Sequence, residues 1–256
     1  MELLSKLFQL AGGRNRSVSN AVSNVIVNDL GRRGYHVIPE FLPPAVCARI
    51  CGQFDELLSE CQEKIQHGES EGTSGDYRLW RVEHRIPELA DVARHPLIHS
   101  AATAYIRTPV VTHAIMMNKV EYRAGKTSNS GGGWHRDTIK PQVKALLYLN
   151  DVGPDNGPFT LVPRSRVVAI AQREGAKATR FADETIDEFV QRHSEKPVEF
   201  TGAAGTCIIA DTSNVHRGKN IAAGHRYCAT NYIKEDTPES WKSSQDAWGR
   251  YFLDAK

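Results

Sequence analysis

The sequence has no long hydrophobic run, no excess of charge of one sign and no secretory leader pattern. No segment of its 256 residues approaches 18 uninterrupted apolar residues, so we predict no membrane-spanning helix. The 32 basic and 30 acidic residues give a net charge of +2, which provides no electrostatic footprint for nucleic acid. The first residues, MELLSKLFQLAGG, lack the basic start and longer apolar stretch of a signal peptide. We therefore expect a cytoplasmic protein whose partner is neither nucleic acid nor the interior of a membrane.

The cysteines form no recognisable disulfide or metal-binding pattern. Their number is odd, and no C-x-x-C motif occurs among Cys47, Cys51, Cys61, Cys207 and Cys228. We expect all of them to be reduced, as is usual in the cytoplasm.

The chain does have the composition of an ordinary globular protein. Apolar residues make up 40% and charged residues 24%, and the length allows one large domain or two small ones. Residues 1–24 are expected to form an N-terminal helix and a linker, because 14–24 is rich in Asn, Ser and Arg. Residues 25–256 are expected to form a single domain that opens with a helix closed by Gly34.

Short apolar or alternating runs dominate the chain after residue 77. Between about 110 and 234, clusters of Gly, Pro and Asn separate these runs, as at 153–157. This pattern is typical of a β-sandwich or jelly roll, so we predict a mainly β fold with flanking helices. Helices are expected at 45–66, at 88–106 with a break at Pro96, in an insertion at about 170–196, and at the C-terminal end at about 237–253.

Two histidines and one aspartate form a potential metal site. Residues 135–137 read His-Arg-Asp and follow a glycine-rich loop. If this segment is a strand, its period of two points His135 and Asp137 the same way and turns Arg136 away. His216 follows the apolar run GTCIIAD, at the end of another expected strand. Two imidazoles and one carboxylate are the ligands that hold non-haem Fe(II) on one face, while a histidine hydrogen-bonded to a carboxylate is the structural alternative.

Arg226 begins the apolar strand RYCATNYIK, shortly after His216. A buried arginine needs an anionic partner, because an unpaired charge inside a protein is costly. The planar guanidinium suits bidentate binding of a carboxylate, and an ion pair at the surface is the alternative.

The triplet at 135–137 also has a superficial likeness to the catalytic loop of protein kinases. That loop requires Lys two positions and Asn five positions after its Asp, where this chain has Ile139 and Gln142. The other kinase motifs, including the glycine-rich loop and A-P-E, are absent from the sequence, so we reject this interpretation.

Three segments, taken in their order along the chain, form a more specific pattern than any one of them alone. They read GGGWHRD at 131–137, KALLYLNDVGPDNGPFTLVPRSR at 144–166 and IADTSNVHRGKNIAAGHR at 209–226. Together they resemble the phytanoyl-CoA dioxygenase-like family of Fe(II)/2-oxoglutarate dioxygenases over about half of the chain. The resemblance implies a double-stranded β-helix, the cupin-like form of the jelly roll, as the core at about 110–234.

The resemblance also implies roles for the motif residues. His135, Asp137 and His216 would be the iron ligands and the catalytic centre. Arg226 would bind the distal carboxylate of 2-oxoglutarate. The implied cofactors are Fe(II), 2-oxoglutarate as cosubstrate, and O2.

Two further pocket residues are expected from strand alternation. The run HAIMMNKVEYR places Asn118 and Tyr122 on one face, and we expect both to look into the cosubstrate pocket. The chain departs from the family pattern at Gly218, where relatives often have a hydroxyl, and at 163–166, where Pro-Arg-Ser-Arg replaces Pro-Gly-Ser-His. Neither departure removes an expected metal ligand.

The implied activity is hydroxylation of a small molecule with release of succinate and CO2. The presence of Asp137 favours hydroxylation over halogenation, because related halogenases lack the carboxylate ligand. An anionic or sugar-like substrate would suit the basic residues near the motifs, which otherwise form a solvated rim: Arg123, Lys126, Lys144, Arg164 and Arg166.

Two other functions stay open at this point. The first is a non-enzymatic jelly-roll binding protein in which the histidines and aspartate are structural. The second is a divalent-metal hydrolase that uses Zn(II), which needs an additional general base such as His225 or Glu121.

Overall fold

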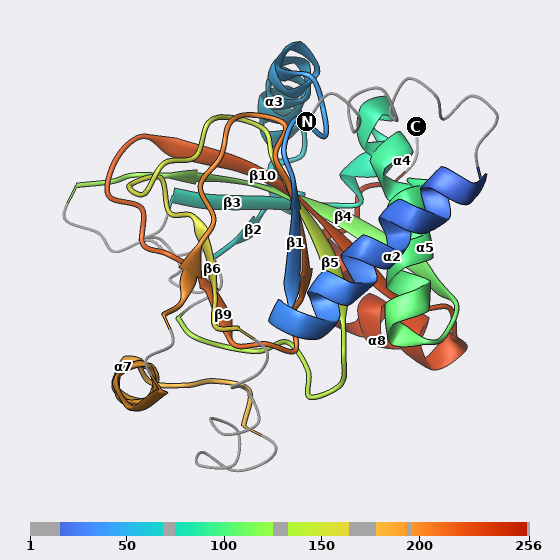
Figure 1. The fold of residues 1–256 in the computed structure, drawn as a ribbon. Helices are drawn as coiled ribbons and strands as arrows, with labels where there is room; N and C mark the ends of the chain where they lie inside the picture. The colour runs from blue at the N-terminus through green and yellow to red at the C-terminus, as the bar shows by residue number, and fades with distance from the viewer. Residues whose placement is uncertain (1–15, 69–74, 125–132, 164–177, 194–195, 255–256) are drawn as a thin grey trace.

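The computed structural model describes residues 16–68, 75–124, 133–163, 178–193 and 196–254. Two antiparallel sheets form its centre (Figure 1). The larger sheet has the order β1 (Tyr35–Ile38), β8 (Cys207–Asp211), β5 (Val143–Tyr148), β10 (His225–Glu235), β4 (Val110–Glu121), β3 (Gly75–Trp80) and β2 (Gln66–His67). The smaller sheet has the order β7 (Val198–Glu199), β6 (Phe159–Leu161) and β9 (His216–Gly218). Strands that are distant in sequence lie side by side, and this arrangement confirms the predicted mainly β jelly roll.

Helices flank the larger sheet, as predicted. The described α-helices are α2 (Arg16–Arg33), α3 (Pro44–Glu60), α4 (Pro87–Ala93), α5 (Pro96–Ile106), α7 (Asp183–His193) and α8 (Pro238–Trp248). Short 3-10 helices occur at η1 (Gln62–Lys64), η2 (Val82–His84) and η4 (Gly249–Tyr251). No helix among the residues placed by the structure is both long and apolar enough to cross a membrane.

The N-terminal part of the domain corrects one prediction and confirms another. The linker expected at 14–24 is wrong from Arg16 onward, because α2 already begins there. The expected helix at the very start of the chain lies outside the described residues. Gly34 does close α2: its φ is +87°, and its amide donates to the carbonyl of Leu30 at 3.1 Å.

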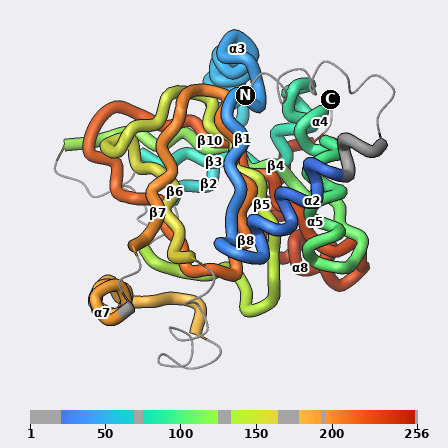
Figure 2. Tube along the Cα trace, viewed as in Figure 1, coloured from blue at the N-terminus to red at the C-terminus, as the bar shows by residue number. Residues whose placement is uncertain are grey.

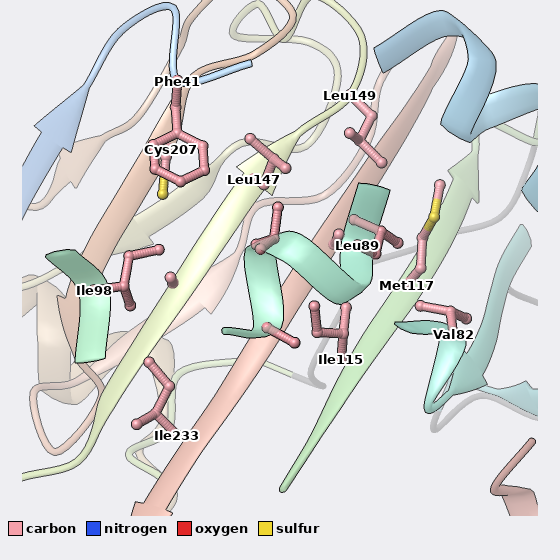
Figure 3. Packing of buried hydrophobic residues seen from close by; sticks show 14 of the residues in the cluster. Phe41, Val82, Leu89, Ile98, Ile115, Met117, Leu147, Leu149, Cys207 and Ile233 are labelled. Carbon is pink, nitrogen blue, oxygen red and sulfur yellow. The ribbon is translucent and has the colours of Figure 1, made fainter. Parts of the chain in front are cut away.

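Strand alternation separates two differently covered faces of the larger sheet. On β5, Ala145 and Leu147 join the cluster of the helices, while Leu146 and Tyr148 join the cluster of the smaller sheet. The smaller sheet and helices α2 and α5 accordingly lie on opposite sides of the larger sheet (Figure 2). The helix side is closely packed with apolar side chains, Ile115, Met117 and Leu147 among them (Figure 3). Both faces of β5 are therefore buried, which explains its continuous apolar run.

Helix α7 covers a separate apolar cluster away from the main core. Its Ile186 and Phe189 pack with Trp134, Val162 and Val215. Trp134 directly precedes His135, and Val215 directly precedes His216. The insertion thus supports both segments that carry the predicted histidines.

Candidate metal centre and its pocket

The two histidines are oriented by backbone carbonyls. His216 begins β9, and its Nδ1 lies 2.9 Å from the carbonyl oxygen of Asn214. The Nδ1 of His135 lies 2.9 Å from the carbonyl oxygen of Gly133. Because a carbonyl oxygen only accepts, each Nδ1 carries the proton and each Nε2 keeps its lone pair for a metal.

Asp137 faces both Nε2 atoms. One carboxylate oxygen lies 4.0 Å from the Nε2 of His135, and the other lies 3.9 Å from the Nε2 of His216. One ligand atom of each residue lies within 4.8 Å of the other two. These separations are too long for hydrogen bonds but are short enough for a single ion to bind all three groups.

The surroundings keep all three groups in their metal-binding form. Burial lowers the pKa of His135 and lowers that of His216 to about 3. Desolvation alone would raise the pKa of Asp137, but the adjacent ammonium of Lys144 and other partners outweigh it and hold the pKa below its usual value. At neutral pH the cluster therefore consists of two neutral imidazoles and one carboxylate, which is the deprotonated ligand set that metals require.

The segment that carries two of these ligands is not the strand that we predicted. Only His135 forms a ladder bridge to His216, and the residues after it are irregular. The amide of His135 donates to the carbonyl of His216 at 2.9 Å, and the amide of Asp137 donates to that of Thr212 at 3.0 Å. Long-range backbone bonds to the β8–β9 turn therefore orient the ligands.

Arg136 turns away from the ligands but not toward solvent. Its side chain is buried, and its Nε donates to the carbonyl oxygen of Ala178 at 2.7 Å. Its guanidinium lies 5.9 Å from the ring centroid of Phe181. The residue between the two ligands thus fixes their loop to the segment that leads into α7.

Arg226 is buried at the side of the same pocket. The residue is only 5% exposed, and its Nε has no hydrogen-bond partner among the residues that the structure describes. None of the carboxylates that the structure places forms an ion pair with it. Arg226 and both histidines line one pocket between the two sheets. An unpaired buried guanidinium marks a position where a bound anion would remove a large electrostatic penalty.

Part of the pocket wall is apolar and is held by hydrogen bonds. Leu146, Tyr148 and Phe159 line it. The hydroxyl of Tyr148 donates to the carbonyl of Phe200 at 2.9 Å and accepts from the amide of Phe159 at 2.9 Å. Tyr148 therefore joins the two sheets with both hydrogen-bonding functions used.

The two residues expected from strand alternation have different positions. Asn118 is buried and lines the pocket, where its Nδ2 donates to Asp76 at 2.9 Å. The prediction for Tyr122 is wrong: its side chain is 46% exposed and is not among the pocket-lining residues. β4 ends at Glu121, so the alternation that was extended to Tyr122 no longer applies there.

Sequence reasoning missed an acidic and a basic residue on β3. Asp76 is fully buried, and Arg78 donates to it through Nε at 3.0 Å while lining the pocket. The alternation of GDYRLW, which places Asp76 and Arg78 on one face, was the available signal. The charges of this pair balance each other inside the pocket wall.

The predicted basic cluster is divided by the fold. Lys144 lies inside the pocket, 7% exposed, with its Nζ 2.7 Å from Asp137. Arg123 is exposed, with its guanidinium over the ring of Tyr77. The other three basic residues, Lys126, Arg164 and Arg166, lie outside the described residues.

The family comparison agrees with this geometry. The family model described as Phytanoyl-CoA dioxygenase (PhyH) matches residues 30–226, more than three quarters of the chain. The chain belongs to this family. A comparison with curated proteins by sequence gives no match.

Solved structures share the fold at low sequence identity. The epimerase SnoN from nogalamycin biosynthesis, in complex with Fe3+, alpha ketoglutarate and nogalamycin RO, has a TM-score of 0.65 and 19% identity; the match covers 85% of each chain. EctD from S. alaskensis with 2-oxoglutarate and 5-hydroxyectoine has a TM-score of 0.59 and 17% identity, over 82% of this chain and 74% of EctD. AviO1 from Streptomyces viridochromogenes has a TM-score of 0.58 and 20% identity, over 85% and 97%.

Proposed function

We propose that the protein is an Fe(II)- and 2-oxoglutarate-dependent oxygenase that hydroxylates a small molecule and releases succinate and CO2. One observation carries this proposal: both histidines of a His-Asp-His cluster line the same pocket as a buried arginine that has no described anionic partner. Membership of the PhyH family and the iron and 2-oxoglutarate named for SnoN and EctD support it. The cytoplasmic location stays a prediction.

The residues present fit both groups. His135, Asp137 and His216 would hold Fe(II) through two Nε2 atoms and one carboxylate oxygen. Arg226 would bind the distal carboxylate of 2-oxoglutarate, since it is the buried cation without a described anionic partner. Bound iron would supply the activation of O2 that is coupled to decarboxylation of the keto acid.

The rest of the pocket orients the cosubstrate and excludes water. The guanidinium of Arg226 would fix one end of 2-oxoglutarate, which restricts the keto acid to one orientation. Leu146 and Phe159 line the same pocket as Arg226 and the two histidines, so the carbon chain would lie against apolar side chains. The carbonyls of Gly133 and Asn214 hold the imidazole tautomers that leave Nε2 free.

Hydroxylation is the simplest outcome for a complete ligand set that includes a carboxylate. The epimerase SnoN and the carbocyclase SnoK are similar to this chain in fold, so the fold alone does not decide the outcome. The chemistry therefore has to be measured on this protein.

The hydrolase alternative finds no support in the pocket. Its candidate bases were His225 and Glu121. His225 is exposed and packs on Tyr227, while Glu121 pairs with Lys119 at 3.1 Å. Neither of them lines the pocket.

The test is spectroscopic and needs no substrate. Purified protein receives Fe(II) and then 2-oxoglutarate without oxygen, and the visible charge-transfer absorption of the chelate is recorded. Air is then admitted and succinate is measured. We expect the band and slow succinate formation in the wild type and in Lys242→Met, an exposed control on α8. The absence of both the band and succinate would show that the protein is not such an oxygenase, and turnover without oxygen would favour a hydrolase.

A further inference from the structure

Lys144 is a buried lysine whose partner is itself a predicted metal ligand. Its Nζ lies 2.7 Å from the carboxylate of Asp137 and 4.0 Å from the ring centroid of Tyr232. β5 pairs with β10 so that Lys144 lies opposite Tyr232, six residues along β10 from Arg226. Six residues of a strand span about 20 Å, so Lys144 and Arg226 start from opposite ends of the pocket face.

The charges of the metal-free pocket leave one cation in excess. The lining cations are Arg78, Lys144 and Arg226. Asp76 balances Arg78 and Asp137 balances Lys144, so Arg226 is left over. Among the residues that the structure places, no carboxylate other than Asp137 forms an ion pair with Lys144, and none forms one with Arg226.

Loading the site would move this excess from Arg226 to Lys144. The carboxylate of Asp137 and the metal-end carboxylate of 2-oxoglutarate would neutralise a divalent metal held by the cluster. The distal carboxylate of 2-oxoglutarate would neutralise Arg226. Lys144 would then have a buried positive charge whose partner, Asp137, is shared with a metal ion. A buried ammonium without a counter-charge is strongly unfavourable, so the loaded site needs one further anion.

A lysine that served only to neutralise Asp137 does not explain this arrangement. Its ammonium would stay beside a divalent cation of the same sign once the metal is bound. Lys234, two residues after Tyr232 on β10, adds to the positive charge at this end; its Nζ reaches Ser244 at 3.1 Å. The proximity of Lys144 lowers the pKa of Lys234, second to burial.

We propose that Lys144 anchors an anionic group, such as a carboxylate, of the primary substrate at the end of the pocket opposite Arg226. This inference rests on the proposed function and names its substrate class. Met116, Thr230 and Tyr232 line the pocket beside Lys144 and would contact the rest of the substrate. Substrate would bind well only after metal and 2-oxoglutarate, because only then would the negative charge of Asp137 be taken up by the metal and Lys144 lack a counter-charge of its own.

The direct test is a crystal structure of the protein loaded with Zn(II) and 2-oxoglutarate and soaked in sodium bromide. Bromide has no shape requirement, and its anomalous signal identifies it. We expect a bromide peak in contact with the Nζ of Lys144, which is absent without Zn(II) and 2-oxoglutarate. No peak there, a peak only at the metal or at surface lysines, or the Nζ bonded to 2-oxoglutarate itself would overturn the inference.

The same map separates this inference from the proposed function. Zn(II) at His135, Asp137 and His216 with 2-oxoglutarate at Arg226 supports the proposed function whatever the bromide does. If both groups lie elsewhere, the proposed function is wrong, and the inference that rests on it is wrong as well. The wild-type map decides without any variant.

A solution experiment gives the size of the effect. Small carboxylates and their matched amides, such as benzoate and benzamide, are titrated into the Zn(II)- and 2-oxoglutarate-loaded protein by ligand-observed NMR. With excess 2-oxoglutarate on Arg226, we expect a carboxylate to bind at least about tenfold more tightly than its amide, or about 1.4 kcal/mol. The preference should vanish in Lys144→Met and persist in Lys144→Arg and in the exposed control Lys242→Met. No preference in the wild type, or an equal preference in Lys144→Met, would contradict the proposal.

Discussion

The two faces of strands β4, β5 and β10 differ in composition: one is apolar, and the other has buried polar and charged residues. On the helix side, Met117 and Leu147 pack into a continuous apolar cluster. On the pocket side, the neighbouring residues include Asn118 and Arg226, and the buried Lys144 pairs with Asp137, a proposed metal ligand. The same backbone thus holds a face that stabilises the fold and a face that retains an uncompensated charge. Variants on the two faces should separate stability from function.

The largest effects are expected at the metal ligands. His135→Ala and Asp137→Ala should both abolish 2-oxoglutarate turnover, because each removes a ligand. They should differ in stability: Asp137→Ala leaves the buried Lys144 without its partner and should cost about 3–5 kcal/mol, whereas His135→Ala should cost far less. Succinate formation and urea unfolding of both variants measure this difference. Equal stability of the two would show that the Lys144–Asp137 pair contributes nothing to folding.

Arg226→Leu should weaken 2-oxoglutarate binding and leave the fold at least as stable. Losing one partner of a buried charge pair costs about 2–5 kcal/mol, so the dissociation constant should rise on the order of thirtyfold or more. The metal-free variant should not unfold more easily, because the substitution removes an unpaired buried charge. Titration of the charge-transfer band and thermal unfolding test both parts, with the exposed Arg250→Leu as control. An unchanged affinity for 2-oxoglutarate would refute the role of Arg226.

A matched pair of leucines tests the two faces directly. Leu147, on the helix side, is 1% exposed, and Leu146, on the pocket side, is 9% exposed. Leu147→Ala should lower the free energy of unfolding by about 2–5 kcal/mol without changing the affinity for 2-oxoglutarate. Leu146→Ala should cost less stability, because its side chain borders the pocket, but should weaken 2-oxoglutarate binding. If both variants changed stability and 2-oxoglutarate affinity alike, the assignment of stability to the helix side and of binding to the pocket side would be wrong.

The smallest expected effect is a pH dependence on the helix side. Burial lowers the pKa of His95, whose ring packs on Phe41, to about 4. Between pH 4 and the ordinary value of about 6.5, the unfolded chain binds a proton that the folded chain does not. The contribution of neutral His95 to the free energy of unfolding is therefore complete above about pH 6.5 and is lost as the pH falls toward 4. In His95→Gln, the loss of unfolding free energy between about pH 6.5 and 4 should be smaller by on the order of 1 kcal/mol. Urea unfolding of the metal-free protein at several pH values measures this difference.

The fold was predictable where local patterns were strong. The turn clusters between short apolar runs predicted the jelly roll, and Gly34 predicted the end of α2. The linker at 14–24 was a wrong prediction, because polar composition does not exclude a helix that buries Ile26 and Leu30 further along. Tertiary packing of residues beyond 24 stabilises helix α2, and the composition of residues 14–24 gives no information about that packing.

The candidate site was predictable as a set of residues but not as an arrangement. His135, Asp137, His216 and Arg226 were all named from the sequence; the structure clusters the first three and places Arg226 in the pocket that both histidines line. Tyr122 was assigned by extending an alternation past the end of β4. The strand expected for the HRD triplet was also wrong, because backbone bonds to His216 and Thr212 orient the ligands without a local strand.

The sequence by itself determined the class of the protein: its ligand types, their order and the family they indicate follow from residue identity. Only the tertiary structure decided how the charges pair. In the sequence, Lys144 is one of five basic residues near the motifs, and Asp76 is not identified as a residue of the site. Charge pairing depends on distances of a few ångströms between strands that are far apart in the chain, such as β5 and the loop of Asp137. No carboxylate that the structure describes pairs with Arg226, and this is the physical reason that the pocket has a place for an anion.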